Sequence, residues 1–457
     1  MLKRQFVSEM IILKFGNAVL TDSDSVERIV SIVRSKLEQK LVIVASAFAG
    51  VADMLSDIAN SAAWLSDNDF PENIEALRQR HILLATDAIA EGAMRDAAVN
   101  DINDLCTELQ AYADAVNVVG EITDRSRAVI LSFGEKLSTV VIRSAIAAAG
   151  IDAALIDASE LIYTKGACLE ATADLAEIAN AAPEIIGEIA GSCDVVVTQG
   201  FIGNCEDCIT RFGKGGCEHT AAILGTVLQA SEIDIFTDVD GIQTADPHRI
   251  AETRTIGRLS FEEATEMAHF GSKILNPSSI ECAILAGVPV RILNANKPTG
   301  EGTLILPGSE IADGVKSISF KENILMLNIY STRMIEVSGF LARVFDVFAR
   351  HGVSVDLIST SEANISLTMD SSRSIDPVVT ELSEIADVKV ATDKAQISVI
   401  GKNVVRQHSL LMWILSSLGH NPIYMVSQGA SSVNISYVVD RAALDTVLQE
   451  LHTNLFE

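Results

Sequence analysis

Residues 1–308 alternate short, continuous apolar runs with helical patterns. Asp24 is expected to cap the first helix, with Glu27 at its capping-box position and an apolar stripe that continues to Leu37. Continuous apolar strands between helices are typical of a mostly parallel sheet covered on both faces. The predicted strands are Met10–Leu13, Leu41–Ala45, Ala128–Leu131, Asp194–Val197, Ile233–Phe236 and Val288–Leu293.

Two regions depart from this alternation. Residues 60–126 are helical, polar and acidic, which predicts an insertion rather than part of the sheet. From about residue 320 a strand–helix–strand–strand–helix order occurs twice, and Asn364-Ile365-Ser366 in the first copy matches Asn434-Ile435-Ser436 in the second. We therefore expect an α/β domain over 1–308 and two ferredoxin-like units over 318–390 and 391–457, with strand exchange between the two units possible.

Composition and charge narrow the classes of function. Hydrophobic residues make up 48% of the 457 residues, which is enough for a sizeable core and excludes a disordered chain. Acidic residues outnumber basic ones by 61 to 34, for a net charge of −27. Such a field repels phosphate backbones, so we expect no nucleic-acid partner. An anionic ligand needs a local pocket that is cationic or lined by amides.

Cysteine usage and hydropathy bear on the compartment. Seven cysteines at irregular spacing favour a reducing environment, and neither a signal-peptide pattern nor a long apolar run is present. We therefore expect a cytoplasmic protein without a membrane contact. Cys205, Cys208, Cys217 and His219 have spacings that zinc sites use, but reduced, unliganded cysteines are the preferred interpretation, and no protein-held metal is predicted.

Three glycine-bearing junctions between a strand and a helix point to a phosphate site: Lys14–Asn17, Ser46–Gly50 and Lys214–Glu218. Glycine lets backbone N–H groups approach an anion, and the following helix N-terminus adds partial positive charge. Lys14 ends a predicted strand, where open α/β sheets bind ligands. No P-loop and no GxGxxG motif follows the first strand, which argues against those nucleotide folds. The acidic turn Phe236–Ile242 is a further candidate for nucleotide contact.

These motifs and others occur in the order found in the aspartate kinase family, and the chain resembles that family over nearly its full length. The matching stretches are KFGN, SAFAGVAD, SFGEKLS, TQGFIG, GKGGCEHTAA, FTDVDGIQTADP, FEEATEMAHFGSKILNP, AGVPVRILN, STRMIEVSGFLARVF, SVDLISTSE and SQGASSVNIS. The resemblance implies an amino-acid-kinase fold followed by two ACT domains. It also implies ATP-dependent phosphorylation of L-aspartate to 4-phospho-L-aspartate, a first step towards lysine, threonine and methionine.

The resemblance assigns roles to individual residues. Lys14 and Glu218 are the implied catalytic residues, and Lys14 would neutralise charge on the transferring phosphoryl group. The implied substrate-binding residues are Ser46, Glu135, Phe201, Lys214, Gly216 and Cys217, with Glu135 towards the substrate amino group and Lys214 towards its α-carboxylate. ATP with Mg²⁺ would contact Lys14, Gly16, Asn17, Thr237, Asp238, Gln243, Asp246, His248, Lys273 and Ile274.

The sequence departs from the family pattern where ligands are expected. The family motif GRGGSD is GKGGCE here, so Lys214, Cys217 and Glu218 replace Arg, Ser and Asp. Lysine cannot form the bidentate fork that arginine offers a carboxylate. Asn17 replaces the second glycine of KFGG. Ala52 replaces a threonine, and Gln243 replaces the tyrosine of the nucleotide loop.

The same resemblance implies regulation by an amino acid, lysine or threonine, and at least a homodimer through the ACT domains. The implied effector-binding residues are Met334, Gly339, Phe340, Leu341, Val355, Asp356 and Ser361. Two alternatives stay open beside an active aspartate kinase. One is an amino-acid kinase with another substrate, which the GKGGCE segment allows; the other is a non-catalytic ACT sensor of amino acids.

Overall fold

The computed structural model describes residues 10–63, 69–270, 277–331, 338–371 and 374–456. These residues form two compact units, each described here by itself. The first unit comprises Met1–Ile242 and Asn276–Pro307, and the second comprises Gln243–Leu275 and Gly308–Glu457. Within the described residues, no helix combines the length and apolar character that a membrane span needs.

The first unit is built on a sheet whose strands follow the order β12-β11-β9-β1-β2-β6-β3. Neighbouring strands run parallel, except that β12 is antiparallel to β11. The bounds are β1 Met10–Phe15, β2 Lys40–Ala45, β3 Ala153–Leu155, β6 Val195–Gln199, β9 Glu232–Thr237, β11 Val290–Asn294 and β12 Thr303–Leu306. Two small hairpins accompany it, β4 Thr164–Lys165 with β5 Thr172–Ala173, and β7 Ile202–Cys205 with β8 Cys208–Arg211.

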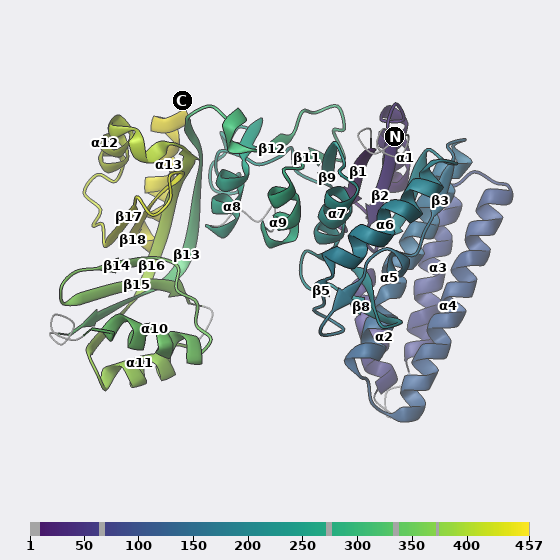
Figure 1. Cartoon of the computed structure of the whole chain (residues 1–457), viewed down its shortest axis with the longest axis horizontal. Coiled ribbons are helices and arrows are strands. Elements are labelled where there is room, and N and C mark those ends of the chain that lie inside the picture. The colour runs from purple at the N-terminus through teal and green to yellow at the C-terminus, as the bar shows by residue number, and fades with distance from the viewer. Residues whose placement is uncertain (1–9, 64–68, 271–276, 332–337, 372–373, 457) are drawn as a thin grey trace. The chain divides into compact units, whose positions relative to one another are not determined.

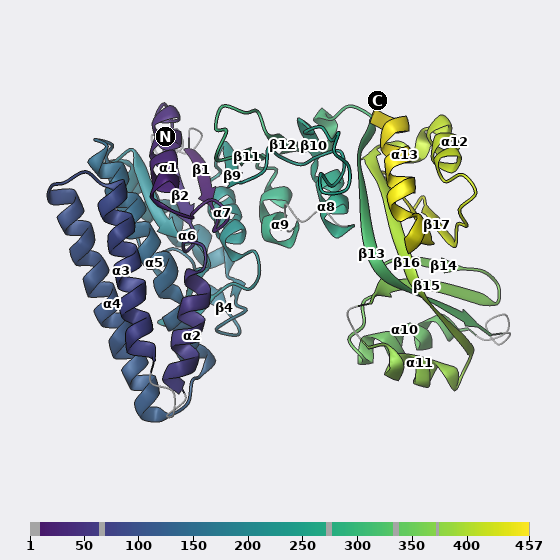
Figure 2. The same cartoon turned by 180° about the vertical axis from the view of Figure 1, so that it is seen from behind.

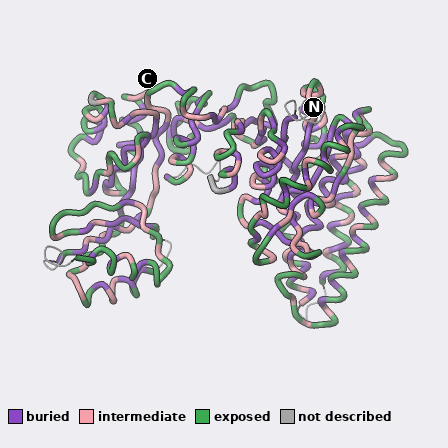
Figure 3. The backbone as a smooth tube through the Cα atoms, viewed as in Figure 1, coloured by how far each residue is buried: buried purple, intermediate pink, exposed green. Residues whose placement is uncertain are grey.

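Helices pack around this sheet, and α3, α4 and α5 run side by side in both views (Figures 1 and 2). Their bounds are α1 Ser23–Ser35, α2 Val51–Ala63, α3 Phe70–Ala88, α4 Ala93–Val119, α5 Asp124–Ala148, α6 Leu175–Ala190, α7 Gly216–Val227 and α9 Pro277–Ala286, with a 3₁₀ turn at Ala158–Glu160. Every residue of β1 and β6 is buried, and the central strands trace the buried interior (Figure 3). The predicted mostly parallel sheet with helical cover is confirmed.

One predicted strand is wrong. Ala128–Leu131 lies inside α5, which begins after Thr123, where the threonine hydroxyl accepts a hydrogen bond from the Ser126 N–H. Ala128, Ile130 and Phe133 are buried, because α5 is covered on several sides and so carries apolar residues around most of its circumference. A short apolar run of this kind cannot be told from a strand by its periodicity.

The second unit contains an antiparallel sheet in the order β14-β15-β13-β16-β18-β17. Its strands are β13 Gly314–Tyr330, β14 Ile358–Thr360, β15 Asn364–Asp370, β16 Asp387–Lys402, β17 Met425–Gln428 and β18 Asn434–Asp440, preceded by β10 Arg258–Ser260. Its helices are α8 Phe261–His269, α10 Phe340–Arg350, α11 Asp376–Ser383, α12 His408–Ser417 and α13 Leu444–Phe456, with 3₁₀ turns at Gly308–Glu310, Val404–Arg406 and Arg441–Ala443.

The repeat predicted from the sequence appears here as a double strand–helix–strand–strand–helix order. The strands β13 and β16 are long enough to serve two hydrophobic cores. Ile318 of β13 packs with α12 and α13, while Leu327 and Ile329 of the same strand pack with α10 and α11. Asn364 and Asn434, which match in the sequence, open the equivalent strands β15 and β18.

The first helix begins at a different cap from the one expected. Asp22 is the N-cap of α1: its carboxylate accepts the Ser25 N–H at 2.8 Å, and the Ser25 hydroxyl accepts the Asp22 N–H at 3.3 Å. Asp24, the predicted cap, is an exposed residue of the first turn. The capping box therefore forms two residues earlier than expected and satisfies the N–H groups of Asp22 and Ser25 instead of those of Asp24 and Glu27.

We expect Asp22→Ala to lower the free energy of unfolding by about 1 kcal/mol, because α1 loses its capping hydrogen bond. Asp24→Ala is the matched control. It should lower the free energy of unfolding by only a few tenths of a kcal/mol (about 0.3 kcal/mol), because Asp24 interacts only with the helix dipole. Urea denaturation followed by circular dichroism measures both. A larger loss from Asp24→Ala than from Asp22→Ala would contradict this assignment of the cap.

Candidate active site

The carboxyl ends of three adjacent parallel strands meet at one edge of the first unit's sheet. Lys14 in β1 is in register with Val44 of β2 and Ile235 of β9. Ser46 follows β2 directly, and Thr237 ends β9. Side chains from three distant segments therefore share this edge, where open α/β folds bind ligands.

An ion pair lies at the centre of this edge. Lys14 Nζ is 2.5 Å from Glu218 Oε1, and only 7% of the Lys14 side chain is exposed. Burial by itself would raise the pKa of Glu218, but the Lys14 charge and its hydrogen bond outweigh it and hold that pKa below its usual range. Glu218 is therefore ionised near neutral pH and forms an ion pair with Lys14. The two residues that the resemblance marks as catalytic are brought together.

Two glycines shape the space around Lys14. A Cβ on Gly16 would lie 2.5 Å from Lys14 Nζ, so only glycine leaves room for the ammonium group to fold back over the turn. Gly215 adopts a φ of 80° as the N-cap of α7, and Glu218 lies in the first turn of that helix. The partial positive charge at the N-terminus of α7 and the Lys14 ammonium together suit an anionic phosphoryl group.

A second buried ion pair contains a residue that the sequence analysis missed. Arg211, the last residue of β8, donates from Nη1 to Glu135 Oε2 at 2.8 Å and from Nη2 to Glu135 Oε1 at 3.1 Å. Its guanidinium carbon lies 5.3 Å from the centre of the Phe201 ring. One sequence signal could have identified Arg211 as a candidate site residue. It is the basic residue of a short strand that lies just before the GKGGCE segment.

Cys217 is buried against the ends of β1 and β2. Its sulfur lies 4.0 Å from the Phe15 carbonyl oxygen and 3.9 Å from that of Val44, and its thiol hydrogen-bonds with Ser46. Burial raises the pKa of this thiol to about 12, so it stays protonated. A protonated thiol is a poor metal ligand.

The other residues of the zinc hypothesis lie elsewhere on the hairpin and helix. Cys205 and Cys208 face each other across the turn of the β7–β8 hairpin, and His219 lies 3.3 Å from the Ser279 carbonyl oxygen. Among residues 10–456 outside the undescribed gaps, no three metal-ligating side chains form a group that suits an ion.

The predicted nucleotide residues fall in both units. Thr237 and Asp238, in the first unit, are hydrogen-bonded to each other at 3.1 Å, and Asp238 is exposed. In the second unit, the Asp246 carboxylate accepts the His248 N–H at 2.9 Å, and Gln243 donates to the Thr255 hydroxyl. Lys273 and Ile274 lie outside the described residues.

The predicted effector residues gather around the start of α10 and the loop before β14. Gly339 caps α10 with a φ of 87°, Phe340 is buried behind it, and Leu341 is 39% exposed. The Asp356 carboxylate lies 3.0 Å from Lys321 Nζ of β13 and is largely buried. Ser361 accepts the Asn364 N–H, Val355 is partly buried against the core of α10 and α11, and Met334 lies outside the described residues.

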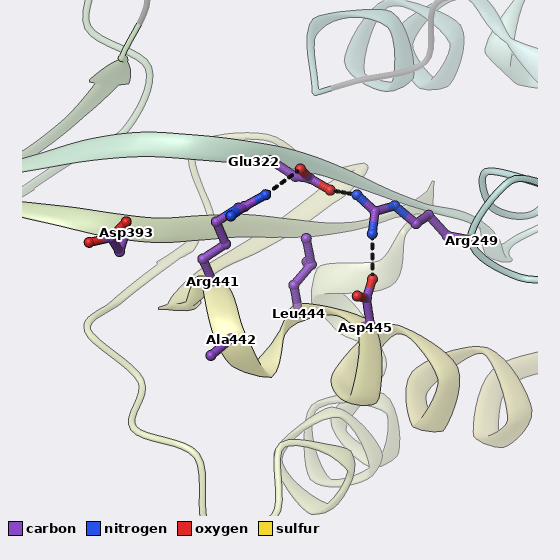
Figure 4. Close-up of a pocket in the computed structure, with 7 residues that line it drawn as sticks. All are labelled: Arg249, Glu322, Asp393, Arg441, Ala442, Leu444 and Asp445. Atoms are coloured by element: carbon purple, nitrogen blue, oxygen red, sulfur yellow. Dashed lines mark hydrogen bonds and ion pairs between the residues drawn. The ribbon is translucent and has the colours of Figure 1, made fainter.

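A separate cavity of about 410 Å³ lies in the second unit, and none of the predicted site residues lines it (Figure 4). Its charged groups are largely paired with one another: Arg249 contacts Glu322 and Asp445, and Arg441 contacts Glu322. The cavity is lined by Arg249, Glu322, Asp393, Arg441, Ala442, Leu444 and Asp445.

Comparisons with known proteins cover both units. A model described as the amino acid kinase family matches residues 9–294, and a model of the ACT domain matches residues 327–379 and 397–455. The lysine-sensitive aspartokinase 3 of Escherichia coli is 31% identical over 461 residues, covering 99% of this chain and 100% of the relative. The chloroplastic aspartokinase 3 of Arabidopsis thaliana is 33% identical, covering 98% of this chain and 81% of the relative.

Solved structures agree with these matches. The crystal structure of E. coli aspartokinase III with aspartate and ADP superposes with a TM-score of 0.80 at 29% identity, covering 98% of this chain and 100% of that chain. The same enzyme with lysine and aspartate gives a TM-score of 0.80 at 30% identity with equal coverage. The aspartate kinase of Clostridium acetobutylicum, at 21% identity and a TM-score of 0.83 over 97% of this chain, shares the fold.

The burial and protonation of Cys217 predict its reactivity. Iodoacetamide reacts with exposed thiolates. At pH 8 it should therefore leave the buried, protonated Cys217 thiol unmodified in the folded protein. The partly exposed Cys205 and Cys208 serve as internal controls and should be labelled. Peptide mass spectrometry after a short pulse gives the three labelled fractions. Labelling of Cys217 as fast as that of Cys205 would contradict the buried, protonated thiol.

Proposed function

The chain belongs to the amino acid kinase family and, within it, to the aspartokinases, and we propose that it transfers the γ-phosphoryl group of ATP to the side-chain carboxylate of L-aspartate. One carboxylate oxygen attacks the γ-phosphorus and the bond to the bridging oxygen breaks. The products are 4-phospho-L-aspartate and ADP. In the cell this reaction would begin lysine, threonine and methionine synthesis in the cytoplasm.

The observation that carries this proposal is the Lys14–Glu218 pair beside the N-terminus of α7. Phosphoryl transfer needs positioning and charge neutralisation more than covalent catalysis, and an ionised carboxylate is already a nucleophile. Lys14 supplies the cation, while Glu218 holds the Lys14 side chain at the strand end. The N-terminus of α7, where Glu218 lies in the first turn, adds partial positive charge.

The nucleotide is proposed to contact Gly16 and Asn17 after β1, and Thr237 and Asp238 after β9. Magnesium prefers few carboxylates and several water and phosphate oxygens, and the exposed Asp238 carboxylate fits that preference. When bound, the ion neutralises charge on the ATP phosphates. The residues proposed from the second unit are Gln243, Asp246 and His248, together with Lys273 and Ile274.

Regulation is proposed to use the ACT domains, with lysine or threonine as inhibitor and a homodimer or larger assembly formed through these domains. Support comes from the match of two ACT segments and from the E. coli relative, which is named as lysine-sensitive. An effector would shift the protein between two arrangements by binding one of them more tightly. Gly339, Phe340 and Asp356 are the proposed core of that site.

An assay of ADP release with each common amino acid tests the proposed reaction. Aspartate should give the highest kcat/KM, and its product should be trapped by hydroxylamine as the hydroxamate. Preference for another amino acid would favour the kinase of different specificity. Absence of ADP release with every amino acid, combined with amino-acid binding by calorimetry, would favour the non-catalytic sensor.

Lys14→Ala should lower kcat by at least about a hundredfold without unfolding the protein, because the transferring phosphoryl group loses its cation. Lys40→Ala is the matched control: Lys40 pairs with Asp194 at the opposite end of the strands and should leave kcat within about twofold. Circular dichroism checks the fold of both variants. Near-normal turnover in folded Lys14→Ala protein would refute the role of Lys14.

Lys321 predicts how the effector site responds to a cationic amino acid. Its ammonium already neutralises Asp356, so lysine must compete with it, and Lys321→Met should tighten lysine binding by about tenfold or more. Isothermal titration with lysine and threonine measures this, with Lys389→Met as an exposed control on β16.

Equal lysine affinity in the parent and in Lys321→Met would contradict the competition by Lys321. Failure of lysine and threonine to bind either protein at millimolar concentration would contradict the proposed effectors.

A further inference from the structure

The buried pair of Glu135 and Arg211 carries a specificity inference that rests on the proposed function. The Arg211 and Glu135 side chains are 10% and 3% exposed, and two hydrogen bonds join them in a bidentate contact. Glu135 lies in the middle of α5 and Arg211 at the end of β8, so 76 residues separate them in the chain. Buried ion pairs are often neutral for stability, which leaves a binding role as the stronger explanation of this one.

Lys214 is a poor candidate for the carboxylate clamp that the resemblance gives it. Its side chain is exposed, and among the described residues its ammonium makes no hydrogen bond or ion pair. A lysine ammonium is also a point charge that cannot form two parallel hydrogen bonds to a carboxylate. Arg211 lies three residues earlier, is buried, and carries the planar fork that Lys214 lacks.

Arg211 and Glu135 are held close to the phosphoryl-transfer residues. One turn after Glu135 in α5, the Ser138 hydroxyl donates to the Ser46 carbonyl oxygen at 2.7 Å, so this part of α5 lies against the end of β2. The Phe201 ring, which contacts Arg211, lies against Gly216 in the first turn of α7, the helix that carries Glu218. Lys14 would face the reacting side-chain carboxylate of the substrate, and the Glu135–Arg211 pair would face the groups on its α-carbon.

We propose that Arg211, and not Lys214, binds the α-carboxylate of the amino-acid substrate, while Glu135 beside it binds the α-ammonium group. A guanidinium has five N–H donors, and the contact with Glu135 uses one on each terminal nitrogen. The outward N–H groups remain for a second carboxylate, and each Glu135 oxygen keeps a lone pair for an ammonium. The pair is neutral overall and matches the opposite charges of a zwitterion.

The geometry around the guanidinium is set before a substrate arrives. Phe201 adopts a φ of 66°, unusual for a residue with a side chain, and its ring lies against Arg211. A Cβ on Gly216 would come within 2.5 Å of the Phe201 ring, so the glycine permits this ring position. A preset guanidinium plane lowers the entropy cost of binding and favours a carboxylate over a neutral amide.

The test compares L-aspartate with its α-amide, which keeps the α-ammonium and the reacting carboxylate but lacks the α-carboxylate charge. In the parent, kcat/KM for aspartate should exceed that for the amide. Arg211→Lys should lower kcat/KM for aspartate by about ten- to a hundredfold, mainly through KM, and leave the amide within about threefold. Lys214→Gln tests the rival assignment: if Arg211 is the clamp, the ratio of kcat/KM for aspartate to that for the amide should stay at the parent value in this variant.

A second variant guards against misfolding, since Arg211→Lys leaves Glu135 with an imperfect partner. Glu135→Gln with Arg211→Gln keeps a neutral, hydrogen-bonded pair, and it should lose the preference for aspartate over the amide while its circular dichroism stays normal. Equal losses on both substrates in either variant would mean a structural role and overturn the inference. A selective loss in Lys214→Gln would return the clamp to Lys214.

Binding measured by isothermal titration separates this inference from the proposed reaction. If the parent binds aspartate without phosphorylating it, the proposed function fails, while the dependence of binding on Arg211 still decides the inference. If the parent phosphorylates aspartate and Arg211→Lys binds aspartate as tightly as the parent does, the inference alone fails.

Discussion

The central strand β1 is the constraint on which the first unit depends. It is buried on both faces and pairs in parallel with β2 on one side and β9 on the other. A one-residue slip would turn Lys14 to the opposite face and bring each apolar side chain of β1 against the layer that packs on the other face. The register that packs the core therefore also positions the Lys14 ammonium, the proposed catalytic cation, near the carboxyl end of β1. Stability and the placement of the proposed site thus depend on one strand pairing.

Charge inside the site is balanced in a chain that carries a net charge of −27. Lys14 pairs with Glu218 and Arg211 pairs with Glu135, so the buried groups are neutral in sum. Isolated buried charges would be costly, whereas paired ones keep their donors and acceptors available to an incoming anion or zwitterion. Local pairing thus allows an acidic protein to bind a phosphorylated nucleotide and a dicarboxylic amino acid.

The second unit uses shared strands to join its two cores. Because β13 contributes to both, a change of packing around α10 acts on a strand that α12 and α13 also cover. The Lys321–Asp356 pair links that strand to the loop proposed to bind an effector. A cation that displaces Lys321 would therefore act on the common strand rather than on a peripheral loop.

The sequence by itself determined the class of fold and the repeat, and it proposed Lys14 and Glu218 as catalytic residues, because periodicity, glycine junctions and ordered motifs are local signals. The structure pairs these two side chains. The prediction of a strand at Ala128–Leu131 was wrong. Because α5 is packed on several sides, this part of the helix has a continuous apolar run like that of a buried strand. Only the tertiary structure decided the partners of Glu135: the guanidinium of Arg211 reaches it across 76 residues of chain. This pairing exists because α5 packs against the β7–β8 hairpin. No local sequence pattern predicts a contact between residues so far apart in the chain.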